Sequence, residues 1–114
     1  MVYDEALAQR VRTALLTMPR VDERKMFGGI TFMVSNQMCC GVLKDELIVK
    51  VGTEGFDQLV AQPHVRAFDF TGRPIVGMVY VAPAGVASDE ALQMWIDRGV
   101  EFVQTHPKSD RRRR

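Results

Sequence analysis

The spacing of apolar residues changes from a helical to an extended period after Pro19, and this change constrains the fold more than any other feature. Before Pro19, apolar residues recur every three or four positions, which predicts an amphipathic helix over residues 5–18 with Asp4 as its N-cap. Residues 20–23 are expected to form the exit loop, because proline disfavours helical geometry in the residue before it. From Arg24 onward the period is two, which is typical of strands. The chain is therefore expected to combine helices with a sheet.

Turn-forming residues divide the extended part of the chain into five expected strands. Three of them follow one another directly, separated only by short turns, over residues 25–34, 38–43 and 46–51. Two more, over residues 65–70 and 75–82, flank the turn sequence Thr-Gly-Arg-Pro. Strands joined by such hairpins pair in an antiparallel manner.

Two further helices are expected between and after these strands. Thr53 is expected to cap a short helix over residues 54–61, and Ser88 to cap a longer one over residues 89–105. The order of elements is then helix, three strands, helix, two strands, helix. This order predicts an α+β fold of two layers, with the helices packed on one face of a five-stranded antiparallel sheet.

Length and composition favour one domain followed by a tail. The 114 residues are 46% hydrophobic and 25% charged, which is typical of a globular domain that folds without disulfides or a metal. We expect this domain over residues 1–106 and a disordered basic tail over residues 107–114. The sequence contains neither a signal-peptide pattern nor an apolar run of about 18 residues. A cytoplasmic protein without membrane contact is therefore expected.

The net charge of +1 is the sum of two unlike parts. Residues 107–114 carry five basic side chains and one acidic side chain, so the tail has a charge of +4 and the body one of −3. An acidic body argues against a broad phosphate-binding face, because nucleic-acid affinity comes largely from lysine and arginine. The candidate nucleic-acid segment is therefore the tail, with Lys108, Arg111, Arg112, Arg113 and Arg114.

Residues 24–29 read Arg-Lys-Met-Phe-Gly-Gly, with the Met-Phe-Gly-Gly run at the opening of the first expected strand. This run and the order of elements resemble the N-terminal domain of the TfoX/Sxy family, known as regulators of bacterial competence, over nearly all of residues 5–105. The resemblance implies an arrangement of sheet and helices similar to secretion-chaperone-like domains, and a non-enzymatic regulatory or adaptor role. The full-length regulators also carry a C-terminal domain of helix-hairpin-helix type, which we do not expect in this chain.

Paired glycines and paired cysteines are the first candidates for chemistry. Gly28 and Gly29 have the freedom to form an anion-binding nest, but a phosphate loop needs its glycines between a strand and a helix. A bulge or a sharp coil in the first strand is therefore their expected role. Cys39 and Cys40 are expected on opposite faces of a strand, one in the core and one exposed. Their expected role is that of small apolar residues, and the alternative is a redox sensor at the exposed position. We expect no metal and no cofactor, because neither the cysteines nor the histidines have partners at ligand spacing.

Basic, aromatic and glycine residues of the body mark a candidate interaction surface: Arg24, Lys25, Phe27, Gly28, Gly29, Lys50 and Tyr80. If the sheet brought the aromatic ones to one face together with Phe32 and Arg66, they would form a stacking surface for single strands. The alternative is a solvated sheet face with the aromatic residues in the core. The methionines either fill the core or line an adaptable groove for a partner, and joint exposure of Met33 and Met78 would favour the groove.

The main functional hypothesis is a regulatory or adaptor domain that acts through protein contacts. Its partner would be an unidentified protein or a second copy of the chain, bound at an edge of the sheet or at the face that the helices leave free. The alternative is a nucleic-acid-binding accessory protein that uses the arginine-rich tail and a sheet face. We expect no enzymatic activity, because the carboxylates fall in caps and turns and form no pair on one strand face.

Overall fold

A computed structural model describes residues 3–18, 20–26, 28–35, 37–69, 72–73 and 75–105. The helices are α1 (Glu5–Ala14), α2 (Phe56–Val60) and α3 (Asp89–Thr105), and a 3-10 turn η1 (Pro83–Val86) precedes α3. The strands are β1 (Val21–Met26), β2 (Gly29–Val34), β3 (Gln37–Leu43), β4 (Glu46–Lys50), β5 (Val65–Phe68) and β6 (Ile75–Val81). Over these residues, no helix is long and apolar enough to cross a membrane. The α+β fold is confirmed, with one strand more than the sequence predicts.

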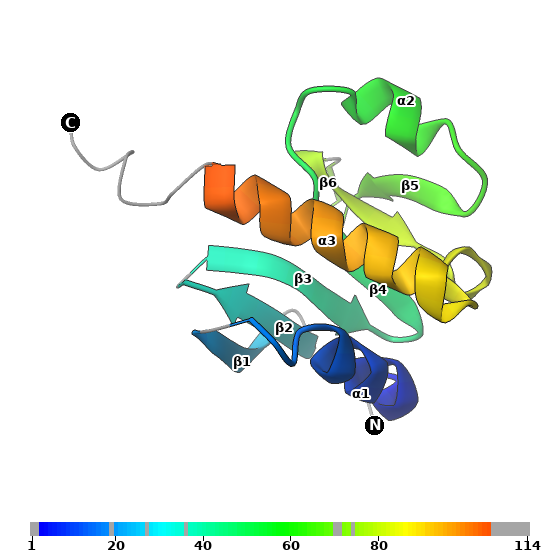
Figure 1. Ribbon diagram of the computed structural model, residues 1–114. Helices are drawn as coiled ribbons and strands as arrows, with labels where there is room; N and C mark the ends of the chain where they lie inside the picture. The colour runs from blue at the N-terminus through cyan, green and yellow to red at the C-terminus, as the bar shows by residue number, and fades with distance from the viewer. Residues whose placement is uncertain are drawn as a thin grey trace.

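The six strands form one antiparallel sheet in the order β1-β2-β3-β4-β6-β5 (Figure 1). Consecutive hairpins join β1 to β4, and β6 then pairs with the free side of β4. Strand β5 pairs only with β6 and forms the second edge of the sheet. The segment with α2 therefore carries the chain from β4 to the far edge, and β6 brings it back to the centre.

The structure differs from the sequence prediction at the first strand. Residues 20–23 lead into and form part of β1 rather than an exit loop, and the expected strand over 25–34 is a hairpin in which Met26 pairs with Gly29. Gly28 has a φ of 80° in the turn, a left-handed conformation that glycine adopts without strain. The glycine pair therefore lies at a hairpin turn between two strands, and not at a bulge or coil inside one strand. Strand β1 was not predicted because it contains four consecutive charged residues, which show no apolar alternation. These residues are tolerated in β1 because it is an edge strand, where such side chains remain in water.

The helix caps agree with the sequence at two of three positions. Asp4 caps α1 and Ser88 caps α3, each by accepting backbone N–H hydrogen bonds at its side-chain oxygen. Helix α1 ends at Ala14 rather than at residue 18, and turns follow it. Helix α2 is not capped by Thr53 as expected, because its N-cap is Gly55, with no side-chain hydrogen bond. Thr53 instead accepts the first N–H of α2 at its carbonyl oxygen.

One main core joins the helices to the sheet. Helix α3 lies across the middle of the sheet with α1 beside it on the same face (Figure 1). Val11 of α1, Phe56 of α2 and Ile96 of α3 all belong to this core, together with Val42 of β3 and Val49 of β4. Each of these side chains is less than a tenth exposed. The apolar residues that recur at helical spacing in the sequence of α3 are the ones that it buries in this core: Leu92, Trp95, Ile96 and Val103.

A bulge in β3 turns both cysteines toward α3. The register between β2 and β3 shifts after Phe32, which leaves Cys39 as an extra residue in β3. Both Cys39 and Cys40 are fully buried in the main core, so the expectation that they lie on opposite faces, one of them exposed, is wrong. Gly99 of α3 sits directly on this bulge, because a Cβ there would lie 2.8 Å from the Cys39 carbonyl oxygen and 3.0 Å from its Sγ.

The other face of the sheet carries a second, smaller apolar cluster, formed by Leu43, Ile48, Phe68 and Tyr80. Each of these side chains is less than a tenth exposed, and the rings of Phe68 and Tyr80 lie 5.0 Å apart. Met33 is only 8% exposed, and Met78 is half-buried against the cluster. This face therefore does not expose Met33 and Met78 together, which is the arrangement that would favour a partner groove there.

Candidate functional site

The candidate site begins with the outer stripe of α3, opposite the stripe that faces the sheet. Five residues at helical spacing lie on the half of α3 that is turned away from the buried stripe: Glu90, Met94, Asp97, Arg98 and Glu101. Met94 is 50% exposed, although it is apolar. The outer stripe therefore combines charged side chains with an apolar side chain that the core does not use.

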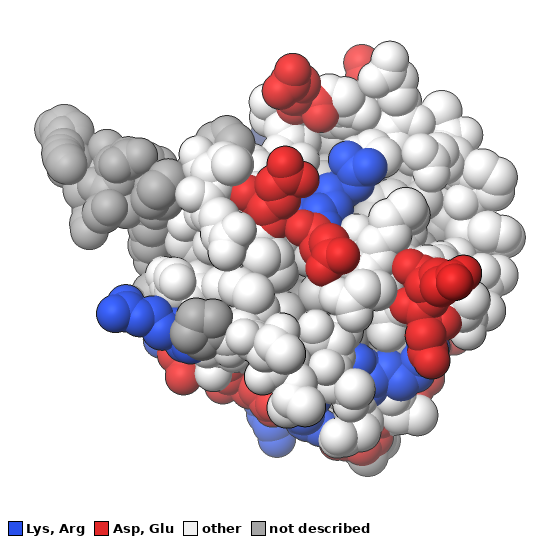
Figure 2. All heavy atoms as spheres, viewed as in Figure 1, with Lys and Arg blue, Asp and Glu red and all other residues white. Residues whose placement is uncertain are grey.

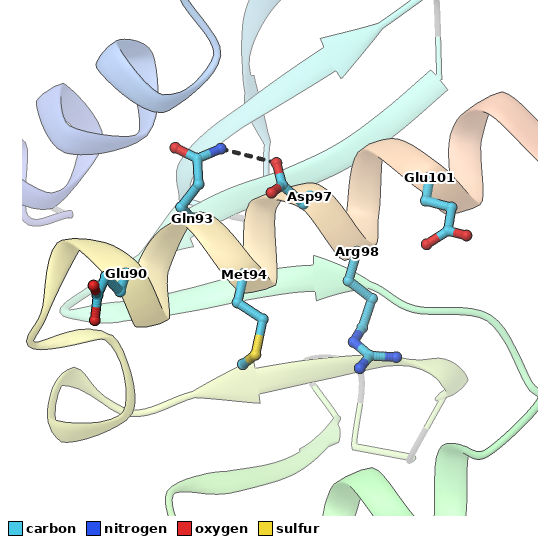
Figure 3. A pocket seen from close by; sticks show the side chains of 6 residues that line it. All are labelled: Glu90, Gln93, Met94, Asp97, Arg98 and Glu101. Atoms are coloured by element: carbon cyan, nitrogen blue, oxygen red, sulfur yellow. Dashed lines mark hydrogen bonds between the residues drawn. The ribbon is translucent and has the colours of Figure 1, made fainter.

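These residues and Gln93 line a hollow of about 530 Å³ along the helix (Figure 3). Met94 and Arg98 point to one side of α3, whereas Gln93 and Asp97 point to the other (Figure 3). Gln93 Nε2 donates a hydrogen bond of 2.8 Å to Asp97 Oδ1. Met94 thus lies in the middle of a hollow with a carboxylate toward either end.

A larger groove, of about 880 Å³, continues from this hollow, since Arg98 and Glu101 line both. Its strand side consists of residues 50–54, at the end of β4 and beyond it, and of residues 76–78 in β6. Val76 is 59% exposed there and adds apolar surface that faces away from the core. We refer to the hollow and the larger groove together as the α3 groove.

Two glycines with positive φ shape the strand side of the α3 groove. Gly52 has a φ of 83° and Gly77 one of 104°. The N–H groups of Val51 and Gly52 donate to the carbonyl oxygen of Gly77, at 2.7 and 3.1 Å, and so tie the exit of β4 to β6. A Cβ at Gly52 would lie 2.7 Å from the ring of Phe102, and Lys50 Nζ lies 5.7 Å from the centre of that ring. Glycine at position 52 therefore lets α3 close onto this loop.

The charged residues that line the α3 groove are mostly acidic. They comprise four carboxylates and two cationic groups, namely Glu54, Glu90, Asp97 and Glu101 against Lys50 and Arg98. In the part of the chain that the structure describes, none of these carboxylates forms an ion pair. Figure 2 shows acidic side chains gathered over α3, with basic surface between them. The excess of carboxylates over cationic groups gives the groove a negative potential.

Polar side chains cover the second cluster on the opposite face of the sheet. The guanidinium of Arg66 lies 4.1 Å from the centre of the Tyr80 ring, and its Nη2 lies 2.6 Å from Glu46 Oε1. Arg66 Nη1 also lies 3.6 Å from Asp69 Oδ1. Burial raises the pKa of Tyr80 above its usual value, although the charge of Arg66 acts in the other direction. On this face, Arg66 therefore covers the ring of Tyr80, and two carboxylates balance the charge of Arg66.

Four of the residues predicted for an interaction surface lie in the β1–β2 hairpin. Arg24 and Lys25 are exposed on the edge strand, and Gly28 lies in the turn. Gly29 begins β2, where a Cβ would collide with the carbonyl oxygen of Val42 in β3. The glycine pair is therefore explained by the turn and by the close approach of two strands.

The remaining predicted residues do not join this hairpin in one site. Lys50 lines the α3 groove, and Tyr80 lies under Arg66. Phe32, expected beside Tyr80 on a stacking surface, is fully buried in the main core. Phe27 and the tail, including Lys108 and Arg111 to Arg114, lie outside the described residues.

The cysteines have the environment of structural thiols. A hydrogen bond with Cys39 and complete burial raise the pKa of Cys40 well above its usual value. Reactive thiols need the opposite shift, because the thiolate is the nucleophile and the metal ligand. Among the described residues, no three histidine, cysteine, aspartate or glutamate side chains are placed to hold a metal ion.

Sequence reasoning did not single out Arg98 and Glu101, and it considered Met94 only as one methionine among several. A signal for Met94 was present, because this residue falls outside the apolar stripe that predicts the buried side of α3. No local pattern in the sequence indicated that residues 50–54 and 76–78 would together line a groove. The strand side of the groove depends on the order of the strands, which brings β6 beside β4 and both of them next to the end of α3.

One comparison with known proteins gives a match. The family model described as the TfoX N-terminal domain matches residues 13–103, from within α1 to near the end of α3. The matched range includes nearly the whole α3 groove. No curated protein and no solved structure matches the chain.

Proposed function

The chain belongs to the TfoX N-terminal domain family, and from this premise we propose that it is a small cytoplasmic regulatory or adaptor domain that binds another protein through the α3 groove. The observation that carries the proposal is the groove itself, where the exposed apolar residues Met94 and Val76 lie among charged side chains. Protein interfaces commonly have this composition, with an apolar centre inside a polar rim.

Three other parts of the described surface offer less to a partner. The helix-free face keeps its apolar cluster covered, with Tyr80 only 5% exposed. The edge strand β1 carries four charged residues in succession, a pattern that hinders the addition of a further strand. Leu16 is 79% exposed but lines neither part of the α3 groove.

The proposal assigns no reaction to the domain. The cysteine thiols are buried, and the pKa of Cys40 is raised, which holds that thiol in its unreactive protonated form. The carboxylates of the α3 groove are exposed, whereas a catalytic acid or base generally works in an enclosed site that tunes its pKa. Binding is the activity that these residues support.

Co-purification from the native host tests the proposal. The tagged wild-type chain is compared with the double variant Val76→Asp/Met94→Asp, in which both exposed apolar side chains of the groove become charged. Leu16→Asp is the matched control, because it makes the same change at an exposed position outside the groove. We expect a protein that purifies with the wild type and with Leu16→Asp but is lost with the double variant. Equal recovery with all three chains, or no specific partner with any of them, would overturn the proposal.

A further inference from the structure

We propose that the partner segment in the α3 groove is basic and amphipathic, with an apolar side chain against Met94 and lysine or arginine side chains on either side of it. This inference rests on the proposed function, because it names the chemistry of the partner at the same site. The probe that represents this partner is a short peptide, and the groove's own residues indicate its composition.

The apolar part of the inference comes from Met94 and Val76. Both are at least half exposed, in adjoining parts of the α3 groove. Met78 adds a third, half-buried apolar side chain to the strand side of the groove. Methionine has a flexible and polarizable side chain, so it adapts to apolar groups of different shape. An apolar anchor on the partner would cover surface that the free domain leaves in water.

The charge of the partner follows from the carboxylates around this apolar surface. Glu90 precedes Met94 by one helical turn, and Glu101 follows it by two turns. At about 1.5 Å per residue, these carboxylates start about 6 Å and about 10 Å from Met94 along the helix axis. Lysine and arginine side chains on both sides of an apolar anchor are long enough to reach them. Asp97 and Glu54 add further negative charge to the same lining.

The two cationic groups of the groove do not reverse its preference for a basic partner segment. Lys50 holds its ammonium group 5.7 Å from the centre of the Phe102 ring, and Arg98 holds its guanidinium 5.8 Å from that of Trp95. Four carboxylates outnumber them, and none of the four is ion-paired within the described residues. An acidic segment would bring like charges against these carboxylates, which disfavours it.

Two fluorescein-labelled peptides of equal length test the inference by fluorescence anisotropy with the full chain. Both have leucine at the anchor positions, and one has lysine where the other has glutamate. We expect the lysine peptide to bind and the glutamate peptide not to bind. Glu101→Gln should raise the Kd of the lysine peptide about fivefold, and Asp97→Asn/Glu101→Gln should raise it further. The matched control is Asp22→Asn, an exposed carboxylate of β1 outside the groove, which should change the Kd less than twofold.

The outcomes separate this inference from the proposed function. The inference fails if the glutamate peptide binds as well as the lysine peptide, if neither binds, or if Asp22→Asn weakens binding as much as Glu101→Gln does. In each of these cases, the co-purification experiment still tests the proposed function independently. A partner that is lost only with Val76→Asp/Met94→Asp would still support binding at the α3 groove, by a segment of different chemistry.

Discussion

Single glycine residues decide how closely distant parts of this domain approach each other. Gly99 allows the middle of α3 to rest on the bulge of β3, and Gly52 allows the end of α3 to close onto the loop after β4. Glycine inside a helix costs about 1 kcal/mol relative to alanine, so its presence at position 99 calls for a reason. The reason is the Cys39 carbonyl oxygen, a backbone atom that cannot rotate away as a side chain would.

Gly99→Ala is expected to destabilise the domain by about 1 to 3 kcal/mol, despite the gain in helix propensity, because the new Cβ would overlap Cys39. Denaturant unfolding followed by circular dichroism measures this change. Gln104→Ala, at an exposed position of the same helix, is the control and should change the free energy of unfolding by less than about 0.5 kcal/mol. A Gly99→Ala variant as stable as the wild type would show that α3 does not rest on the bulge.

Cys40 gives the domain a sensitivity to alkaline pH. Its folded-state pKa is raised, so above the unfolded-state pKa of about 8.5 the unfolded chain loses a proton that the folded chain keeps. The free energy of unfolding should therefore fall as the pH rises above this value, by at most about 1.4 kcal/mol per pH unit from this thiol. The contribution of Cys40 is measured as the difference in pH dependence between the wild type and Cys40→Ala. Parallel curves for the two proteins between pH 7.5 and about pH 9.5 would contradict the raised pKa.

At the scale of elements, strand β1 makes a contact with α1 that no local pattern reveals. Arg12 of α1 binds Glu23 of β1 through two hydrogen bonds, at 2.6 Å from Nε and 3.0 Å from Nη2. Glu5 also lies 3.3 Å from the same guanidinium, and these carboxylates raise the pKa of Arg12 further above its usual value. The first helix thus holds the charged edge strand by its side chains.

A double-mutant cycle with Arg12→Ala and Glu23→Ala tests this link. We expect a coupling energy of about 0.5 to 1 kcal/mol, because the pair has bidentate geometry but remains partly in water. The coupling should shrink at high salt, where screening weakens exposed ion pairs. Additive effects of the two substitutions would mean that the pair does not hold β1 to α1.

The sequence predicted those elements that follow from local patterns. The span of α3, its Ser88 cap and the pairing of β3 with β4 all agree with it. It missed β1, because the edge of a sheet accepts charged residues that a period-two pattern excludes. It misplaced the cysteines, because one extra residue in a strand turns the side chains that follow to the other face. Of the α3 groove, it named Lys50 for an interaction surface and Met78 for a possible partner groove, but it did not bring them together in one site. The two walls of the groove come from segments far apart in the chain.

At the scale of the whole molecule, charge is distributed unevenly. The body carries −3 and the tail +4, and the carboxylates of the α3 groove account for part of the acidic excess. The aromatic residues that would stack on nucleic-acid bases are not presented together, because Phe32 is in the main core and Tyr80 lies under Arg66. We therefore expect the body to contribute little to the binding of nucleic acid.

A chain that ends at residue 106 should accordingly bind single-stranded DNA with a Kd above roughly 10⁻⁴ M at physiological salt, weaker than typical non-specific binding. Fluorescence anisotropy with a labelled oligonucleotide measures the affinity and its dependence on salt. The full chain is the comparison, because it adds the basic tail and nothing else. Micromolar affinity with a steep salt dependence in the shortened chain would show that the body itself has a phosphate-binding surface.

Site-specific photo-crosslinking in the native host tests most directly whether the α3 groove is the binding surface. A photoreactive amino acid is placed singly at Met94 and Val76, inside the groove, and at Leu16, an exposed apolar position outside it. We expect the same protein to be crosslinked from both groove positions and not from Leu16. Crosslinks to that protein from Leu16 but from neither groove position would contradict binding at the α3 groove.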